Sequence, residues 1–303
     1  MTGRRVVAIV GPTATGKSEL AVALATRLDA EIVNADSMQL YIGMDVGTAK
    51  INRAQRHGVP HHLLDLWPIT KSAAVAEYQR LARSTITDIH GRARLPVVVG
   101  GSGLYVRGAL DRLEFPGESL SIRNRLLSEL AVSGPASLHA RLATLDAAAA
   151  ASILPTNGRR IVRALEVIEL TGRPFLATMP AFESIYDCVQ IGLDRDDLDE
   201  RVALRVDRMM QAGFLEEVRA LLTAGLRTSP TAGKALGYAQ VMGCLDDTGA
   251  VVGDLGVALE ATVRATRRFV RRQRSWFRRD PRIRWFDAAA PGLLDQVTNI
   301  LDR

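Results

Sequence analysis

The chain has 303 residues, 47% of them hydrophobic, and a formal net charge of +6. This length suits one large domain with a smaller attachment, and the composition can build a substantial core. The first apolar stretch, Val6 to Val10, leads into glycine-rich sequence without the cleavage pattern of a signal peptide. No apolar run approaches the roughly 20 residues that span a bilayer. Cys188 and Cys244 are isolated and lack metal-ligand spacing, which favours the reducing cytoplasm.

Strands alternate with helices in the first hundred residues. Apolar and β-branched residues predict three buried strands, and stripes of helical period predict two helices between them. The strands are expected at Arg4–Val10, Glu31–Asn34 and Pro96–Val99, and the helices at Ser18–Leu28 and about Ala73–His90. The pattern predicts an α/β fold: a P-loop NTPase-like parallel sheet flanked by helices. In such sheets, ligands bind at the carboxyl ends of the strands.

The middle of the chain is predominantly helical. Helices are predicted at Ile122–Ala131, Ala136–Leu145 and Arg160–Leu170, and Gly172 with Pro174 should end the last of them. The alanine run Ala147–Ala151 is expected to continue a helix. We therefore predict a smaller all-helical insertion domain, residues 117–186, within a catalytic core of residues 1–116 and 187–303.

The final part of the core is predicted to contain a strand and several helices. The strand is expected at Asp187–Leu193 and a helix at about Leu198–Ala212, followed by largely helical sequence. The segment Glu260–Arg284 contains ten arginines and two acidic residues, a balance of +8 that exceeds the net charge of the whole chain. Such a concentration indicates a polyanionic partner, although a solvated helix face remains an alternative.

The strongest motif is a phosphate loop. Gly11-Pro12-Thr13-Ala14-Thr15-Gly16-Lys17-Ser18 matches G-x-x-x-x-G-K-[ST] and lies between a predicted strand and a predicted helix. Its glycines allow the backbone amides to surround a phosphate, Lys17 would neutralise phosphate oxygens, and Ser18 could hold Mg²⁺. The loop predicts phosphate binding without specifying the reaction.

Asp36 follows the second predicted strand, within the run Asn34–Tyr41. Three roles are open from the sequence. The carboxylate could hold Mg²⁺ through water, act as a general base on a nucleophile, or cap the following turn. The neighbouring Ser37 and Gln39 could read the edge of a base, which favours the general base.

Two further segments are less specific. Gly100-Gly101-Ser102-Gly103 follows the third strand and predicts either a tight turn that a ligand can approach or a plain strand-to-helix connection. The pair His61-His62 cannot direct both rings to one metal ion from a regular strand. We therefore expect no metal site at these histidines.

Together these motifs resemble the tRNA dimethylallyltransferase (IPP transferase) family. The resemblance runs over nearly the whole chain and rests on the segments Gly11–Ser18, Asn34–Tyr41, Gly100–Tyr105, Pro155–Val167, Gly233–Gln240 and Arg267–Arg279. It implies transfer of a dimethylallyl group from dimethylallyl diphosphate to the exocyclic amine of the adenosine 3′-adjacent to the anticodon in tRNA. It further implies Mg²⁺ as cofactor, the anticodon stem-loop as macromolecular partner, and a cytoplasmic enzyme, expected to be a monomer, without membrane attachment.

The resemblance also assigns roles to residues. Asp36 would be the general base, Thr13 would hydrogen-bond the leaving oxygen, and Lys17 would complete the catalytic set. The diphosphate would be held by Gly11, Pro12, Thr13, Ala14, Thr15, Gly16, Lys17, Ser18, Arg201 and Arg205, with Mg²⁺ at Ser18. The tRNA would contact Asp36, Ser37, Met38, Gln39, Ser102, Arg123, Arg159, Arg160, Ile161, Val162, Arg163, Arg268 and Arg272.

Three details of these helices are predicted from spacing. In the insertion, Ile161, Leu165 and Ile168 should be buried, whereas Arg159, Arg163 and Glu166 should face outward. The family usually has an acidic residue at the position of Asn157, and asparagine can still cap the helix. The late helix, Leu259 to about Arg279, should bury Leu259, Val263, Thr266, Val270 and Phe277.

Other functions are compatible with a phosphate loop. An adenylate isopentenyltransferase would act on free nucleotides, whereas the helical insertion and the basic helix favour a macromolecular substrate. A P-loop kinase for a small molecule would leave the basic helix unexplained. An RNA-binding ATPase would hydrolyse ATP and ignore a prenyl diphosphate.

Overall fold

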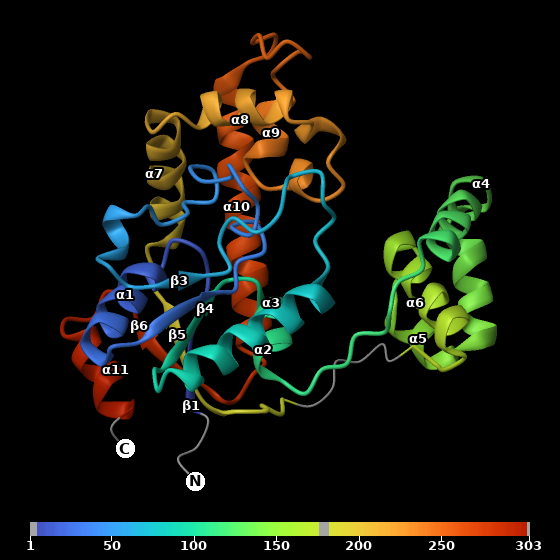
Figure 1. Cartoon of the computed structure of the whole chain (residues 1–303). Coiled ribbons are helices and arrows are strands. Elements are labelled where there is room, and N and C mark those ends of the chain that lie inside the picture. Colours follow the sequence, from blue (N-terminus) through green and yellow to red (C-terminus); the bar gives the residue numbers. More distant parts are fainter. Residues whose placement is uncertain (1–4, 176–181, 302–303) are drawn as a thin grey trace. The chain divides into compact units, whose positions relative to one another are not determined.

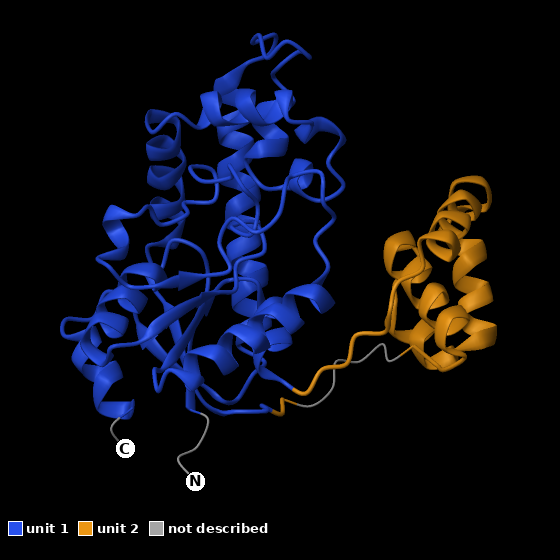
Figure 2. Ribbon diagram, viewed as in Figure 1, with its two compact units in different colours: residues 1–111, 184–303 blue, residues 112–183 orange. Residues whose placement is uncertain are grey.

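The computed structural model describes residues 5–175 and 182–301, and the chain divides into two compact units (Figures 1 and 2). Unit 1 comprises Met1–Asp111 and Ser184–Arg303, and unit 2 comprises Arg112–Glu183. Arg4, at which the first strand was expected to begin, lies outside the described residues, as do residues 176–181 of the expected insertion.

Unit 1 is built on a six-stranded sheet in which every neighbouring pair is parallel, in the order β3-β2-β4-β1-β5-β6. Its strands are β1 (Arg5–Val10), β2 (Glu31–Asn34), β3 (His61–His62), β4 (Pro96–Gly100), β5 (Asp187–Asp194) and β6 (Ile283–Asp287). Its helices are α1 (Lys17–Leu28), α2 (Val75–Gly91), α3 (Gly103–Leu110), α7 (Leu198–Gln211), α8 (Phe214–Thr223), α9 (Tyr238–Met242), α10 (Leu255–Phe277) and α11 (Leu293–Leu301). The predicted α/β class is confirmed.

Alternating side chains of β1 explain the layered core. Val6, Ala8 and Val10 belong to a hydrophobic cluster with residues of α2 and α3, whereas Val7 and Ile9 belong to a second cluster with residues of α1 and α11. Successive side chains of a strand point to opposite faces, so β1 is apolar throughout because helices cover both faces of the sheet. The carboxyl ends of the strands remain for ligand binding.

A buried carboxylate joins the short edge strand β3 to the sheet. The side chain of Glu31 on β2 is 4% exposed and lies 2.6 Å from Nε2 of His62 and 2.7 Å from Nη2 of Arg92. Hydrogen bonding from Arg92, assisted by His62 and opposed by burial, lowers the pKa of Glu31 from 4.5 to about 2. The ionised carboxylate therefore stabilises the folded state.

Glu31→Gln is expected to lower the free energy of unfolding by about 3 kcal/mol at neutral pH, since a pKa shift of this size corresponds to that energy. Because the folded pKa is depressed, the contribution is present above about pH 5 and is lost as the pH falls towards 2. Urea unfolding at several pH values measures it. Glu260→Gln is the control, because Glu260 forms an exposed pair with Arg264 and should cost less than about 1 kcal/mol. Equal losses in the two variants would contradict the prediction.

Unit 2 is helical and has its own core. Its helices are α4 (Leu120–Leu145), α5 (Ala147–Ser152) and α6 (Gly158–Thr171). Gly134, with φ 75° and ψ 169°, interrupts α4 just before Pro135, which agrees with the two helices predicted there. Gly172 ends α6 in the left-handed conformation, as predicted. The core of the unit is formed by Leu126, Leu138, Leu142, Ala149, Ala150, Ile153, Ile161, Val162, Ala164 and Leu165.

One prediction for unit 2 was right in part and one was wrong. The alanine run is helical, as expected, but it forms the separate helix α5, because Asp146 ends α4 and its Oδ1 accepts a hydrogen bond from the Ala149 amide at 2.9 Å. Glu166 is fully buried instead of facing outward. Its carboxylate accepts hydrogen bonds from the Ser119 amide, Arg123 and Arg163, and these partners compensate for burial of the charge.

Helix α10 begins four residues earlier than predicted and buries a different face. Asp254 caps its first turn by accepting a hydrogen bond from the Val257 amide at 3.2 Å. Val270 and Phe277 are buried as expected, but Leu259, Val263 and Thr266 are only partly buried. The other buried positions are Ala258, Thr262, Ala265 and Gln273. Small and polar side chains occupy this face because α10 packs closely on other elements.

Candidate active site

The phosphate loop connects β1 to the start of α1. Gly11 has φ 134°, and a Cβ added there would lie 2.2 Å from the Leu193 carbonyl oxygen, so only glycine fits. Gly16 occupies the position before α1 with φ 91°. The Thr15 hydroxyl donates to the Pro12 carbonyl oxygen at 2.9 Å and closes the loop. The first amides of α1 therefore face the space enclosed by the loop, where the helix N-terminus favours an anion.

Lys17 is poised to receive that anion. Its Nζ donates to the Pro12 carbonyl oxygen at 2.5 Å. Burial lowers the pKa of Lys17 from 10.5 to about 8, the positive charge of Arg205 contributes in the same direction, and Asp36 and Glu19 oppose it. A bound phosphate would stabilise the ammonium form and raise the pKa of Lys17 again.

Asp36 lies immediately after β2, at the same edge of the sheet as the phosphate loop. Its Oδ1 accepts a hydrogen bond from the Met38 amide at 3.0 Å, and its own amide donates to Oδ1 of Asn34 at 3.0 Å. The capping role considered from the sequence is therefore present. Among the described residues, no side chain or backbone group hydrogen-bonds Oδ2, so this oxygen can accept a proton from a ligand.

The turn after β4 lies beside Asp36. The Ser37 amide donates to Oγ of Ser102 at 3.2 Å, and the two hydroxyl oxygens are also 3.2 Å apart. A Cβ at Gly100 would lie 2.3 Å from the Ala35 carbonyl oxygen, so the absence of a side chain allows the two loops to meet. The predicted glycine turn is thus a contact surface for the segment that carries Asp36.

A cavity of about 320 Å³ opens beside these loops. Thr13, Asp36, Ser37, Met38 and Ser102 line it at the carboxyl ends of the strands. The remaining wall is largely apolar and comes mainly from α7, the segment 234–238 and α10, with residues Gly47, Thr48, Val202, Arg205, Val206, Met209, Phe214, Lys234, Ala235, Leu236, Gly237, Tyr238, Thr262, Thr266, Phe269 and Arg272. A polar end beside the phosphate loop and an apolar wall suit an amphipathic phosphate ester.

The two arginines of α7 that were expected to bind diphosphate each donate a hydrogen bond to a backbone carbonyl oxygen. Nε of Arg201 donates to the Ala14 carbonyl oxygen at 2.8 Å, and Nη2 of Arg205 donates to the Thr48 carbonyl oxygen at 3.2 Å. Burial lowers the pKa of Arg205, and Asp36 and Glu19 oppose the shift. Arg201 therefore contacts the phosphate loop directly, and the charge of Arg205 acts on Lys17 of that loop.

The comparisons with known proteins agree with this geometry. A family model described as IPP transferase matches residues 39–280. The tRNA dimethylallyltransferase of Thermobifida fusca is 62% identical over 299 residues, covering 96% of this chain and 92% of the relative. That of Streptomyces avermitilis is 60% identical and covers 96% and 93%. The chain belongs to the IPP transferase family.

Solved structures of IPP transferases share the fold. The tRNA isopentenylpyrophosphate transferase of Bacillus halodurans aligns with a TM-score of 0.71 at 38% identity, covering 99% of this chain and 96% of that one. A eukaryotic dimethylallyltransferase acting on tRNA aligns with a TM-score of 0.74 at 25% identity, covering 99% and 77%.

The residues expected to contact tRNA lie in both units. In unit 1, Arg268 is exposed on α10, and Arg272 lines the cavity with its guanidinium 5.7 Å from the Phe269 ring centroid. Gln39 does not line the cavity; its Nε2 donates to the Thr48 carbonyl oxygen at 3.1 Å.

In unit 2, Arg159 and Arg160 are exposed, whereas Arg123 and Arg163 pair with Glu166. Ile161 and Val162 are buried in the core of the unit, so their side chains are not available to RNA in this structure. Oδ1 of Asn157 accepts a hydrogen bond from the Arg160 amide at 3.2 Å, which confirms the predicted cap.

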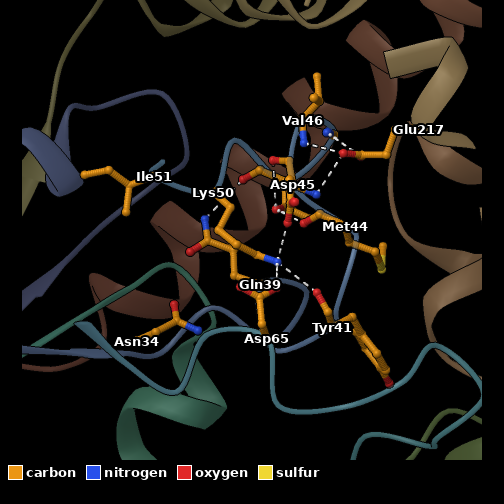
Figure 3. A network of polar contacts seen from close by, with 12 residues as sticks. Asn34, Gln39, Tyr41, Met44, Asp45, Val46, Lys50, Ile51, Asp65 and Glu217 are labelled. Atoms are coloured by element: carbon orange, nitrogen blue, oxygen red, sulfur yellow. Dashed lines mark hydrogen bonds and ion pairs between the residues drawn. The ribbon is translucent and has the colours of Figure 1, made fainter. Parts of the chain in front are cut away.

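The sequence prediction missed the polar network around Asp45, Lys50 and Glu217 that Figure 3 shows. Gly47 and Thr48, which follow Asp45 in the chain, line the cavity. Glu217 accepts hydrogen bonds from the amides of Asp45, Val46 and Gly47 at 2.9, 2.7 and 3.1 Å. Lys50 pairs with Asp45 at 2.6 Å and Asp65 at 2.5 Å. Glu217 lies more than 160 residues after Lys50 in the sequence, and no local pattern connects the two.

Proposed function

We propose that this chain transfers a dimethylallyl group from dimethylallyl diphosphate to the exocyclic amine of the adenosine 3′-adjacent to the anticodon of tRNA. The names of the relatives support this reaction. The observation that carries it is the single cavity that Thr13 of the phosphate loop and Asp36 line together with an apolar wall. Such a cavity can hold a diphosphate, a short prenyl chain and a nucleophile side by side.

The donor binds with its diphosphate on the phosphate loop and its prenyl chain against the apolar wall. Lys17, Arg201 and Arg205 balance the negative charge, and the amides of residues 14–18 accommodate the phosphate oxygens. The Thr13 hydroxyl donates a hydrogen bond to the oxygen that leaves the prenyl carbon. These donors are worth most as charge grows on the departing diphosphate.

The acceptor amine lies at Asp36. Its nitrogen forms a bond to the first prenyl carbon as the bond from that carbon to the diphosphate oxygen breaks, and Asp36 takes the proton released from the nitrogen. Ser37, Met38 and Ser102 line the cavity beside Asp36, where the base would enter. The adenosine must leave the stacked anticodon loop to reach the cavity.

The residues at the loop fit a magnesium ion. Ser18 carries a hydroxyl at the second position of α1, and Asp36 lies close enough to Lys17 to oppose the lowering of its pKa. Hydroxyl, carboxylate and diphosphate oxygens are the ligands that Mg²⁺ prefers. When bound, the ion would neutralise charge on the diphosphate, with Ser18 as its protein ligand.

The tRNA contacts α10 of unit 1 and the arginines of unit 2. Phosphate contacts position the RNA without reading its sequence, and RNA sequence is read chiefly from unstacked bases. The exposed arginines of α10 and Arg159 and Arg160 of α6 provide such phosphate contacts.

Replacing Arg268 and Arg272 together by alanine is expected to weaken tRNA binding and to reduce the slope of log affinity against log salt by about 1.5. Filter binding at several salt concentrations measures this slope. The control replaces Arg53 and Arg80, two exposed arginines elsewhere in unit 1, and removes the same charge. An unchanged slope in the α10 variant would assign the RNA to another face.

The reaction is tested with the purified chain, Mg²⁺, dimethylallyl diphosphate and unmodified tRNA, followed by digestion and mass spectrometry of the nucleosides. A parallel sample contains ATP in place of the prenyl donor, and a third contains a tRNA with guanosine at the target position. We expect dimethylallyl adenosine only with donor and adenosine. Consumption of ATP without prenyl transfer would favour a kinase or an ATPase.

A further inference from the structure

Gln273 connects the arginine-rich helix α10 to two loops of the active site. Its side chain is 5% exposed. Its Oε1 accepts a hydrogen bond from the Thr13 amide at 3.0 Å, and its Nε2 donates to the Gly101 carbonyl oxygen at 2.9 Å. Both ends of one buried amide are therefore used, one on the phosphate loop and the other on the turn after β4.

Helix α10 lies so close to that turn that a side chain at position 101 or 103 would collide with Gln273 or Trp276. A Cβ at Gly101 would lie 2.4 Å from Nε2 of Gln273, and a Cβ at Gly103 would lie 2.0 Å from Nε1 of Trp276. Helix α10 thus lies directly against the turn, and the glycines recognised in the sequence are needed on account of α10. A shift of α10 would move the turn, since tightly packed groups transmit displacements.

The same turn supports the segment that carries Asp36. Ser102 lies between Gly101 and Gly103, and its hydroxyl oxygen accepts the Ser37 amide. Gln273 therefore acts on the leaving-group side of the cavity through Thr13 and on the base side through Gly101. Its helix also carries Arg268 and Arg272, which bind RNA in the proposed function.

We propose that Gln273 is a positioning residue for prenyl transfer: its amide fixes the Thr13 backbone and the Gly101 turn relative to each other. The inference rests on the proposed function. A side chain that aligns the leaving oxygen and the base contributes in the transition state more than in tRNA binding. Loss of this residue should therefore lower kcat and leave KM for tRNA nearly unchanged.

Gln273→Met keeps the length of the side chain and removes both hydrogen bonds. We expect kcat to fall about 10- to 100-fold, with KM for tRNA within about threefold of the original. Gln296→Met is the matched control, because Gln296 also donates its amide to a backbone carbonyl oxygen, that of Pro291, and is exposed on α11; its kinetics should not change. A kcat within threefold of the original, or an effect on KM alone, would overturn the proposal.

Gln273→Glu provides a readout that a purely structural role would not give. When protonated, the glutamic acid can still accept from the Thr13 amide and donate to the Gly101 oxygen, whereas the carboxylate would face that oxygen without a proton. Burial favours the protonated form. The ratio of kcat for Gln273→Glu to that of the original chain should therefore rise at least about fivefold from pH 8 to pH 6, and that for Gln273→Met should stay flat.

A flat ratio for Gln273→Glu would overturn the proposal even if Gln273→Met failed to fold. The same assays distinguish failure of the proposed prenyl transfer from failure of the positioning role of Gln273. An original chain that binds dimethylallyl diphosphate but transfers nothing refutes the proposed function. Transfer by the original chain together with full activity of Gln273→Met refutes the positioning role alone.

Discussion

Asp36→Asn is expected to lower kcat for prenyl transfer about 10³-fold, within the range for loss of a general base. Asparagine keeps the oxygen that accepts the Met38 amide, so the turn should remain, and only the proton acceptor is lost. Binding of dimethylallyl diphosphate should stay within a few fold, because Asp36 acts on the amine. Single-turnover kinetics and calorimetric titration of the donor measure the two quantities.

Asp246→Asn is the matched control for Asp36. Asp246 also caps a turn, accepting the amides of Thr248 and Ala250 at 2.9 Å each, and does not line the cavity. Its replacement should leave kcat unchanged. Turnover by Asp36→Asn within tenfold of the original would reject Asp36 as the base and leave the capping role.

Lys17→Met is expected to weaken binding of dimethylallyl diphosphate about 100-fold, the loss of one hydrogen bond between charged groups in a half-buried site. The original chain should show a pH dependence with the same origin. Because the pKa of Lys17 is about 8, the ammonium form is present below pH 8 and is lost above it. The donor affinity should therefore fall about tenfold per pH unit between pH 8 and 9.5, and the variant should lack this fall.

A melting measurement and a control variant show whether the effect of Lys17→Met is specific to donor binding. Without donor, Lys17→Met should melt at a higher temperature at pH 7, since it removes a charge whose burial is unfavourable below pH 8. Lys71→Met is the control, because Lys71 pairs with Glu77 and does not line the cavity; donor affinity should be unchanged. A donor affinity independent of pH in the original chain would contradict the role of Lys17.

The sequence predicted those parts of the fold whose causes are local. The phosphate loop, the strand before it and the helix after it follow from a contiguous motif, and β1, β2 and β4 from contiguous apolar runs. The strand β5 was also expected, although Gln190 and Gly192 interrupt its apolar residues. The strand β3 was missed because it has only two residues, held to β2 with the help of Glu31. The strand β6 was missed because it directly follows arginine-rich sequence and contains Arg284 and Asp287.

The parts of the site that could not be predicted depend on contacts between distant segments. Gln273 stands among arginines in the sequence, and only the packing of α10 on the turn at Gly101 shows its two hydrogen bonds. Glu166 was assigned to the surface from helical spacing, yet Arg123 and Arg163 make its burial tolerable. Local periodicity cannot predict the burial or the hydrogen bonds of polar residues whose partners lie far along the chain.

The most direct test of the proposed chemistry is the structure of the chain with an unreactive analogue of dimethylallyl diphosphate and a tRNA anticodon stem-loop. We expect the diphosphate on the amides of residues 14–18, the prenyl chain against the apolar wall, and the adenosine amine about 3 Å from Oδ2 of Asp36. An adenosine bound away from Asp36, or a diphosphate bound away from the phosphate loop, would contradict the assignment of this cavity as the active site.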